Sequence, residues 1–199
     1  MIRWDAHPSK MEDLSLLSNL DFVDSIDIVF PENEGYSLYG RDGIQSTDIY
    51  QGSLGNCWFM HGASAVAAKP GRIERVFLND ELSNNGIYGL NFYALGVPTT
   101  VLIDDTMPLD ASGNLIFARE SKDGGLWGPI IEKGFAKLSG TYENIVGGDP
   151  IISIQTLTGA PSDRIYHKGH SANIETFSKH PEIYQHDALE VWESIRSAP

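Results

Sequence analysis

The arrangement of apolar and charged positions along the chain predicts two core helices. Residues 57–68 are mostly apolar and contain no Lys, Arg, Asp or Glu, which favours a helix buried on nearly all sides. The Lys69-Pro70-Gly71 run that follows predicts its end. A second helix is predicted before Gly140, because apolar side chains recur there at helical spacing: Trp127, Ile131, Phe135 and Leu138.

Shorter apolar runs between these helices predict strands. They cover residues 87–95, 99–103 and 115–118, and the intervening segments 96–98 and 110–114 have the composition of turns. A small antiparallel meander is the simplest arrangement. Near the C-terminus, a last amphipathic helix is predicted from Tyr184, Ala188, Val191 and Ile195. We therefore expect an α+β fold.

Composition and charge narrow the functional classes. The 199 residues suit one globular domain, and the net charge of −13 argues against binding to nucleic acid or to an anionic membrane surface. No stretch approaches the ~20 apolar residues of a membrane span, and the N-terminal residues do not resemble a signal peptide. We expect a soluble, intracellular, cytoplasmic protein. Its one cysteine, Cys57, excludes an internal disulfide.

The beginning of the chain is acidic. Residues 11–40 contain seven Asp and Glu and no Lys or Arg, which is more typical of a solvated acidic arm or adaptor than of a cation or partner site. The resulting domain prediction is an acidic N-terminal arm over residues 1–40, a central domain over 41–166 and a polar C-terminal tail with a terminal helix over 167–199.

A glycine-bearing loop, residues 51–56, delivers Cys57 to the first turn of the first predicted helix. The positive end of a helix dipole stabilises a thiolate, which favours a nucleophile. Gly52 and Gly55 allow the backbone to approach a substrate closely, and Gln51 is placed to donate its amide to an oxyanion formed beside the sulfur. The alternative is a buried structural thiol, because glycine-rich turns before helices are common.

The residues around Cys57 closely resemble the signature around the catalytic cysteine of calpain-type cysteine proteases. That resemblance rests on Thr47-Asp48-Ile49, Gln51-Gly52, Leu54-Gly55 and Cys57-Trp58. It covers residues 28–166 and includes further matches at Phe30-Pro31, Ser37-Leu38, Ser64-Ala65, Arg75-Val76-Phe77, Asp104-Asp105, Pro108, Leu115-Ile116-Phe117, residues 126–138, Gly140-Thr141-Tyr142-Glu143 and Leu157-Thr158-Gly159.

The resemblance implies a papain-like core of two lobes, of which residues 41–166 match the first. Cys57 would be the nucleophile and Gln51 the oxyanion donor. A histidine and an asparagine of the second lobe would complete the site, and papain-like enzymes place them ~130 to 150 residues after the cysteine. The last histidine here is His186 and the last asparagine Asn173, so we expect the second lobe on a partner chain or in a remainder of the gene product.

The histidines of this chain are weaker candidates for the catalytic base. His170 follows a glycine, as the family's catalytic histidine does, but the alternative is a solvated residue in a polar tail, as for His167, His180 and His186. His61 lies one helical turn after Cys57, where a base would sit behind the thiol, so we predict a packing role for it.

Calcium is the second implication of the resemblance. Asp48 matches an acidic calcium ligand before the Gln-Gly loop, and Gly43 matches a carbonyl ligand upstream. Gly125 stands where the family has a glutamate, and calcium prefers six to eight oxygens including carboxylates, so the predicted site is weak. The alternative is that Asp48 hydrogen-bonds the loop. Asp104 and Asp105 are predicted to form a turn rather than to bind metal.

Two hypotheses about function follow. The first is a cysteine endopeptidase module that attacks peptide carbonyls of protein substrates through Cys57 and is incomplete without the lobe that carries His and Asn. The second is a catalytically inactive calpain-like scaffold or regulatory binding module. Both share a fold, so only the site can separate them.

Overall fold

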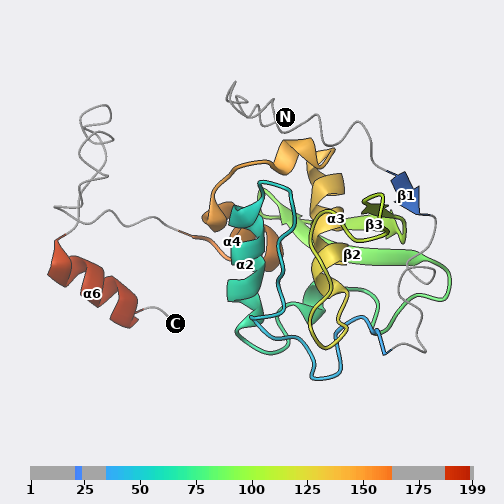
Figure 1. The fold of residues 1–199 in the computed structure, drawn as a ribbon. Coiled ribbons are helices and arrows are strands. Elements are labelled where there is room, and N and C mark those ends of the chain that lie inside the picture. The colour runs from blue at the N-terminus through green and yellow to red at the C-terminus, as the bar shows by residue number, and fades with distance from the viewer. Residues whose placement is uncertain (1–20, 24–34, 163–186, 198–199) are drawn as a thin grey trace. The chain divides into compact units, whose positions relative to one another are not determined.

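The computed structural model describes residues 21–23, 35–162 and 187–197 (Figure 1). The chain divides into two compact units, Met1–Pro161 and Ser162–Pro199. In the first unit, α3 (Trp127–Ser139) and α4 (Pro150–Thr158) pack against the hairpin of β2 (Ile87–Ala94) and β3 (Val97–Asp104), and α2 (Cys57–Ala67) packs against α4. The prediction of mixed helix and antiparallel strand is thereby confirmed.

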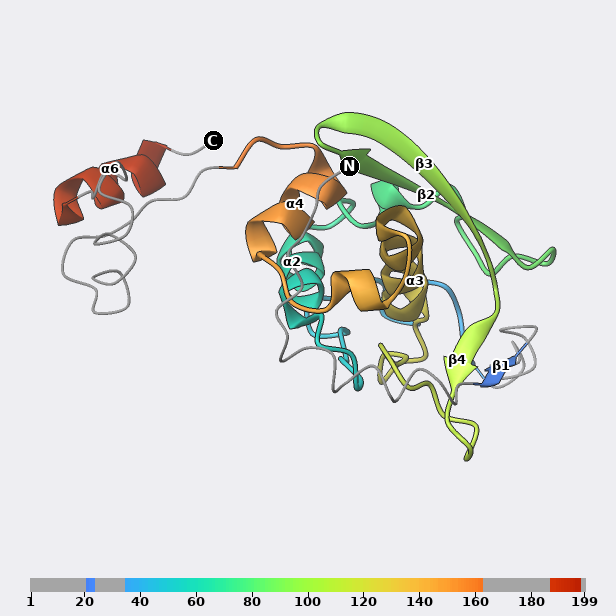
Figure 2. The same cartoon turned by 90° about the horizontal axis from the view of Figure 1, so that it is seen from above.

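Aromatic side chains join the layers of the first unit. Phe59 of α2 and Phe135 of α3 stack with ring centroids 4.0 Å apart, and Phe92 of β2 meets the edge of Phe135. Figure 2 shows α3 between α2 and the curved hairpin. Both helices begin where the sequence predicts, and Gly140 ends α3 with a φ of 103°, a conformation that favours glycine.

The strands differ from the predicted meander. β2 and β3 form an antiparallel hairpin in which Ile87 is opposite Asp104, whereas residues 115–118 form no strand. A short β4 (Met107–Leu109) instead pairs with β1 (Asp21–Val23). Leu115 forms a single antiparallel bridge with Leu109 of β4, and the Ile116 N–H donates to the Pro108 carbonyl. The predicted third meander strand does not extend further, because the Ile116 carbonyl and the Arg119 N–H bond to the loop that precedes α2.

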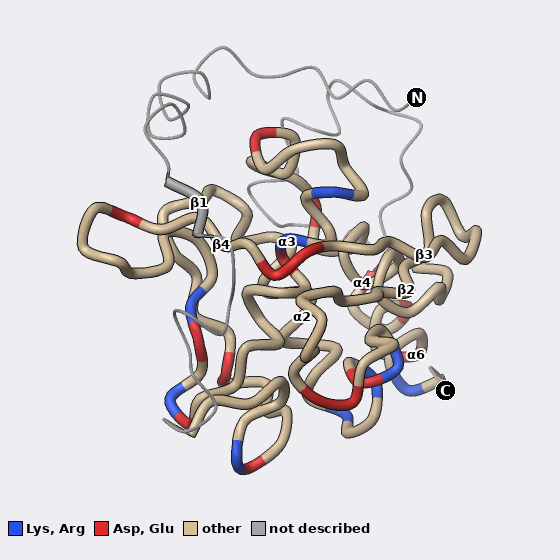
Figure 3. The backbone as a smooth tube through the Cα atoms, turned by 90° about the vertical axis from the view of Figure 1, so that its right-hand side faces the viewer, with Lys and Arg blue, Asp and Glu red and all other residues tan. Residues whose placement is uncertain are grey.

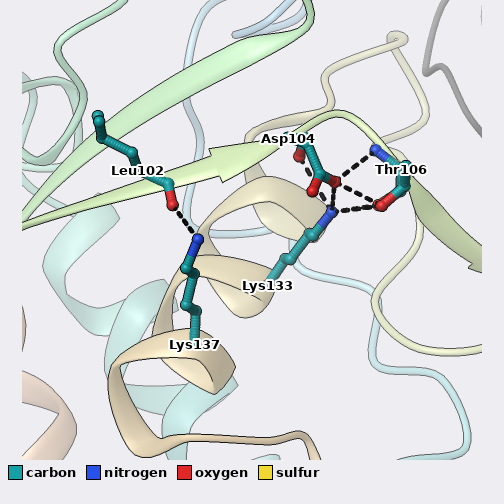
Figure 4. A network of polar contacts seen from close by, with 5 residues as sticks. All are labelled: Leu102, Asp104, Thr106, Lys133 and Lys137. Carbon is teal, nitrogen blue, oxygen red and sulfur yellow. Dashed lines mark hydrogen bonds and ion pairs between the residues drawn. The ribbon is translucent and has the colours of Figure 1, made fainter.

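Polar contacts attach α3 to the hairpin (Figure 4). The Lys133 ammonium forms an ion pair with Asp104 and donates to the Thr106 carbonyl at 2.5 Å, and Lys137 donates to the Leu102 carbonyl at 2.6 Å. Asp104 also accepts the Thr106 N–H, which confirms the predicted turn. Burial opposes ionisation of Asp104, but hydrogen bonds from Lys133 and Thr106 outweigh it and lower its pKa to about 2.

The α4 helix was not predicted, although its ends carry ordinary signals. Asp149 is the N-cap and accepts the Ile151 N–H at 3.1 Å, Pro150 is the first helical residue, and Gly159 closes the helix with a φ of 69°. Short 3-10 turns over Glu74–Val76 and Glu143–Ile145 complete the helical elements of this unit within the described residues.

The two predicted terminal segments lie mostly outside the described residues. In the part of the arm that is described, Leu38 is only 1% exposed and belongs to the core, so the solvated surface does not extend to it. In the second unit, α6 (Ala188–Ser197) confirms a C-terminal helix and contains no buried residue. Tyr184, the first residue of that prediction, lies outside the described range.

Candidate active site

Cys57 is the first residue of α2, and its side chain is exposed. The neighbouring Trp58, Phe59 and Met60 are buried, so the thiol stands at the edge of a well-packed helix. The prediction of a helix buried on nearly all sides was wrong for one face, because Cys57, His61 and Ala65 recur at a spacing of one helical turn and are all exposed.

The loop before Cys57 is braced by residues 115–119. Ser53 N–H donates to the Ile116 carbonyl and Arg119 N–H to the Tyr50 carbonyl, both at 2.9 Å. Gly52 is required by this contact, because a Cβ built there would lie 1.9 Å from the Phe117 carbonyl oxygen. The close backbone approach predicted for Gly52 is therefore present, but it is made to the Phe117 carbonyl of the protein itself rather than to a substrate.

Gln51 is exposed like Cys57, and its side-chain amide is engaged within the loop. Its Nε2 donates to the Leu54 carbonyl at 2.6 Å. An amide nitrogen carries two hydrogens, so one N–H remains beyond this bond. The structure records the contact of this amide with Leu54 and none with the Cys57 sulfur.

A buried pair fixes the residue next to Cys57. Asn56 is fully buried, and its Nδ2 donates to Glu132 Oε1 at 2.6 Å, while Glu132 Oε2 accepts the Ala118 N–H at 2.9 Å. Burial raises the pKa of Glu132 to about 7, against the two hydrogen bonds that favour its ionised form. Glu132 therefore ties α3 both to the start of α2 and to the segment that braces the loop.

A glycine pair forms a further part of the site that sequence reasoning missed. Gly147 N–H donates to the Gly55 carbonyl at 2.8 Å, which places residues 147–148 beside the loop that carries Cys57. A Cβ on Gly148 would lie 2.4 Å from the Trp58 ring, and Trp58 itself donates its indole N–H to the Ile145 carbonyl. The signal available in the sequence was the Gly147-Gly148 pair itself.

His61 is the only histidine among the described residues. It is exposed, so the predicted packing role was wrong. It lies on the same face of α2 as Cys57 but one turn further into the helix. His167, His170, His180 and His186 lie outside the described residues.

The residues at the predicted calcium site do not fit a calcium ion well. Asp48 Oδ2 accepts the Gln45 N–H at 2.7 Å and the Trp127 indole N–H at 3.4 Å, as expected of a residue that fixes its loop. Gly125 provides no carboxylate, and the described residues contain no cluster of three or more His, Cys, Asp or Glu that could hold a metal. Gly43, the other predicted ligand, has a φ of 72°.

A carboxylate connects two loops next to the predicted calcium site. Asp123 accepts the Asp42 N–H at 3.0 Å and the Ser121 hydroxyl, and the Ser121 oxygen accepts the Gly125 N–H at 2.7 Å. A Cβ on Gly40 would collide with the Asp123 carboxylate. The protein's own side chains therefore connect residues 40–42 to residues 121–125.

Comparison with known proteins identifies the family of this chain. The family model described as calpain family cysteine protease matches residues 30–193. The chain is 36% identical over 135 residues to the calpain-type cysteine protease ADL1 of Oryza sativa, 32% over 133 residues to calpain-5 of Mus musculus and 31% over 142 residues to calpain-12 of Homo sapiens.

These similarities define the class, that of cysteine proteases. More narrowly, the chain belongs to the calpain family. The matched regions cover 68%, 62% and 70% of this chain, but only 6%, 21% and 20% of the respective relatives, so it corresponds to a small part of each. None of the helices in the described residues has the length and apolar character needed to cross a membrane.

Proposed function

We propose that the chain is the cysteine-bearing lobe of a calpain-type endopeptidase, with Cys57 as the nucleophile and Gln51 as an oxyanion donor. The observation that carries the proposal is the exposed thiol at the first residue of α2, beside a loop that backbone hydrogen bonds hold in place. Free N–H groups and the helix dipole favour negative charge at that position, both on the sulfur and on the oxygen of a bound carbonyl.

In the proposed reaction, the thiol proton passes to a base while the sulfur bonds to the peptide carbonyl carbon. The C–N bond then breaks, and the proton returns to the leaving amine. Water hydrolyses the resulting thioester and restores the thiol. Gln51 contributes by donating the N–H that is not bound to Leu54, or by exchanging that bond for one to the oxyanion.

We propose that the catalytic base is not among the described residues. His61 lies one turn behind Cys57, so we place the catalytic histidine and the asparagine that orients it on a second lobe, supplied by a partner chain or by further sequence. Protein substrates would bind between the lobes. Calcium binding by Asp48 and Gly43 is implied by the resemblance alone, and because the residues present do not fit the ion well, no step of the proposed reaction depends on it.

Alkylation kinetics test the role of Cys57. We expect iodoacetamide to modify Cys57 faster than it modifies a cysteine in an unstructured peptide, and the Cys57→Ser variant to remain unmodified. His61→Ala should react like the parent chain if His61 is not the base. Gln51→Ala should retain the fast alkylation but lose reaction with a peptidyl electrophile that forms an oxyanion. Alkylation at the rate of the unstructured peptide would contradict the proposal.

The second candidate is a binding module without catalysis. The bond between the Gln51 amide and Leu54 favours it, because an oxyanion donor should be available to the substrate. This hypothesis predicts that no peptidyl electrophile reacts with Cys57 faster than iodoacetamide does, even when a second lobe from a calpain relative is added.

A further inference from the structure

Asn56 and Glu132 form a buried polar contact for which packing alone gives no reason. Both residues are at most 1% exposed, and Asn56 Nδ2 donates to Glu132 Oε1. Asn56 Oδ1 is buried as well and has no hydrogen-bond partner within the described residues. An unpaired buried oxygen and a buried carboxyl both cost stability, and apolar side chains of similar size would fill the same space. The pair therefore needs an explanation beyond packing.

Helix capping does not explain Asn56 either. Asn56 is the N-cap residue of α2, where an asparagine side chain usually accepts an N–H of the first turn, but here it forms no such bond. The first turn is closed by the Asn56 backbone carbonyl, which accepts the Phe59 N–H at 2.9 Å and the Met60 N–H at 3.2 Å. Among the described residues, no backbone acceptor meets the Cys57 N–H. The Asn56 side chain is thus committed to Glu132, and the Cys57 N–H stays available.

The α2 helix brings no charge of its own to this N-terminus. It contains no Lys, Arg, Asp or Glu and is tan along its length in Figure 3. Favourable electrostatics for an anion at Cys57 therefore come from peptide groups, whose direction depends on how the chain enters the helix. A residue that fixes the peptide unit between Asn56 and Cys57 consequently fixes the direction of the first N–H.

Glu132 is connected to both ends of the loop before Cys57. At one end it binds the Asn56 side chain directly. At the other end its Oε2 accepts the Ala118 N–H at 2.9 Å, and the residues around Ala118 bond to the loop on either side of Gln51. One carboxyl of α3 is therefore linked to the backbone of both groups, Gln51 and the Cys57 N–H, that can stabilise an oxyanion at this site.

We propose that Glu132 is a positioning residue for the reaction at Cys57, and that it orients the Cys57 N–H and the Gln51 amide for the oxyanion through its hydrogen bonds to the loop. This inference rests on the proposed function, because it assumes that Cys57 attacks a peptide carbonyl. Both protonation states of Glu132 can hold Asn56. The carboxylate accepts from Nδ2, and the carboxylic acid donates to Oδ1 once the Asn56 amide has turned over.

The test compares two reagents on the same cysteine. A peptidyl chloromethyl ketone forms an oxyanion when the sulfur attacks its carbonyl, whereas iodoacetamide forms none, so the ratio of the two rates reports oxyanion stabilisation and corrects for thiol reactivity. We expect this ratio to fall about tenfold in Glu132→Met, which has similar length but cannot accept the two N–H groups. Glu132→Gln should stay within about threefold of the parent, because it can still bond to Asn56 and Ala118. Glu143→Gln, an exposed change on the turn after α3, should leave the ratio unchanged.

A change on the loop side separates positioning from folding. Asn56→Ala removes the same hydrogen bond and leaves Glu132 in place, so it should also lower the ratio. The double variant of Asn56→Ala with Glu132→Met should be no lower than Glu132→Met alone, because both changes interrupt one connection. A ratio equal to that of the parent in both single variants would overturn the positioning role, as would an equal fall in Glu132→Gln and Glu132→Met.

Failure of this inference is distinguishable from failure of the proposed function. Fast reaction of the parent chain with the chloromethyl ketone, together with an unchanged ratio in Glu132→Met, refutes the positioning role alone. If the parent reacts with the chloromethyl ketone no faster than with iodoacetamide, the proposed function fails, and hydrogen exchange of residues 51–57 decides whether Glu132 holds the loop. Faster exchange there in Glu132→Met and Asn56→Ala but not in Glu132→Gln would support this hold, and exchange equal to that of the parent would overturn it.

Discussion

Replacement of Glu132 by glutamine tests the buried pair that fixes Asn56. Glutamine has nearly the same shape, so its oxygen can still accept the Ala118 N–H. Its NH2 group would then face Asn56 Nδ2, which is also a donor, so the Asn56 amide has to turn over and accept through Oδ1, which is buried and has no hydrogen-bond partner in the described structure. Glu132→Gln therefore removes a titrating group and leaves the packing of α3 in place.

The size of the effect follows from the pKa of Glu132. Folding raises this pKa from 4.5 to about 7, so the native state holds its proton more tightly than the unfolded chain over this interval. The stabilisation is complete below pH 4.5 and is lost as the pH rises through about 7. A pKa difference of this size corresponds to about 3 kcal/mol in the free energy of unfolding.

Urea unfolding followed by tryptophan fluorescence between about pH 4.5 and about pH 8 measures this loss. The free energy of unfolding of the parent chain should decline by about 3 kcal/mol more than that of Glu132→Gln. Glu143→Gln, an exposed change on the 3-10 turn after α3, should follow the parent. Parallel curves for the parent and Glu132→Gln would refute the reasoning, because Glu132 would then not titrate in this range.

Two further predictions concern the loops around the site. Gly52→Ala should displace the loop from the Phe117 carbonyl, because a Cβ there collides with that oxygen. The rate at which peptidyl electrophiles alkylate Cys57, followed by mass spectrometry, should then fall at least about tenfold. An unchanged rate would mean that reaction at Cys57 does not depend on this loop position. Asp123→Ala should lower the melting temperature by several degrees, because it removes the hydrogen bond from the Asp42 N–H. Millimolar calcium should leave the melting temperature of the parent chain unchanged. A rise with calcium would show that an ion contributes to the connection.

Local signals were sufficient for the helices that carry the site. The beginning of α2 at Cys57 and the end of α3 at Gly140 follow from short-range patterns of apolar residues and from glycine conformation. The α4 helix had equally local signals in Asp149, Pro150 and Gly159, and it was missed although its N-cap and C-cap residues are typical.

Long-range contacts explain what the sequence could not predict. The apolar pattern of residues 115–118 is real, since Leu115 and Phe117 are buried, but pattern alone does not reveal that their backbone pairs with the Cys57 loop. Asn56 and Glu132 are 76 residues apart in the sequence, and no local pattern around either residue predicts the hydrogen bond between them. The family resemblance supplied Cys57 and Gln51 as candidates, whereas the engagement of Gln51 with Leu54 required coordinates.

The exposed thiol at the start of α2 is also the only sulfhydryl of the chain. A maleimide dye would therefore attach at one known position, and its emission would report on whatever approaches the loop before that helix. Air oxidation can link two copies by a single bridge and cannot extend further. A covalent species larger than a dimer on a non-reducing gel would have to arise from different chemistry.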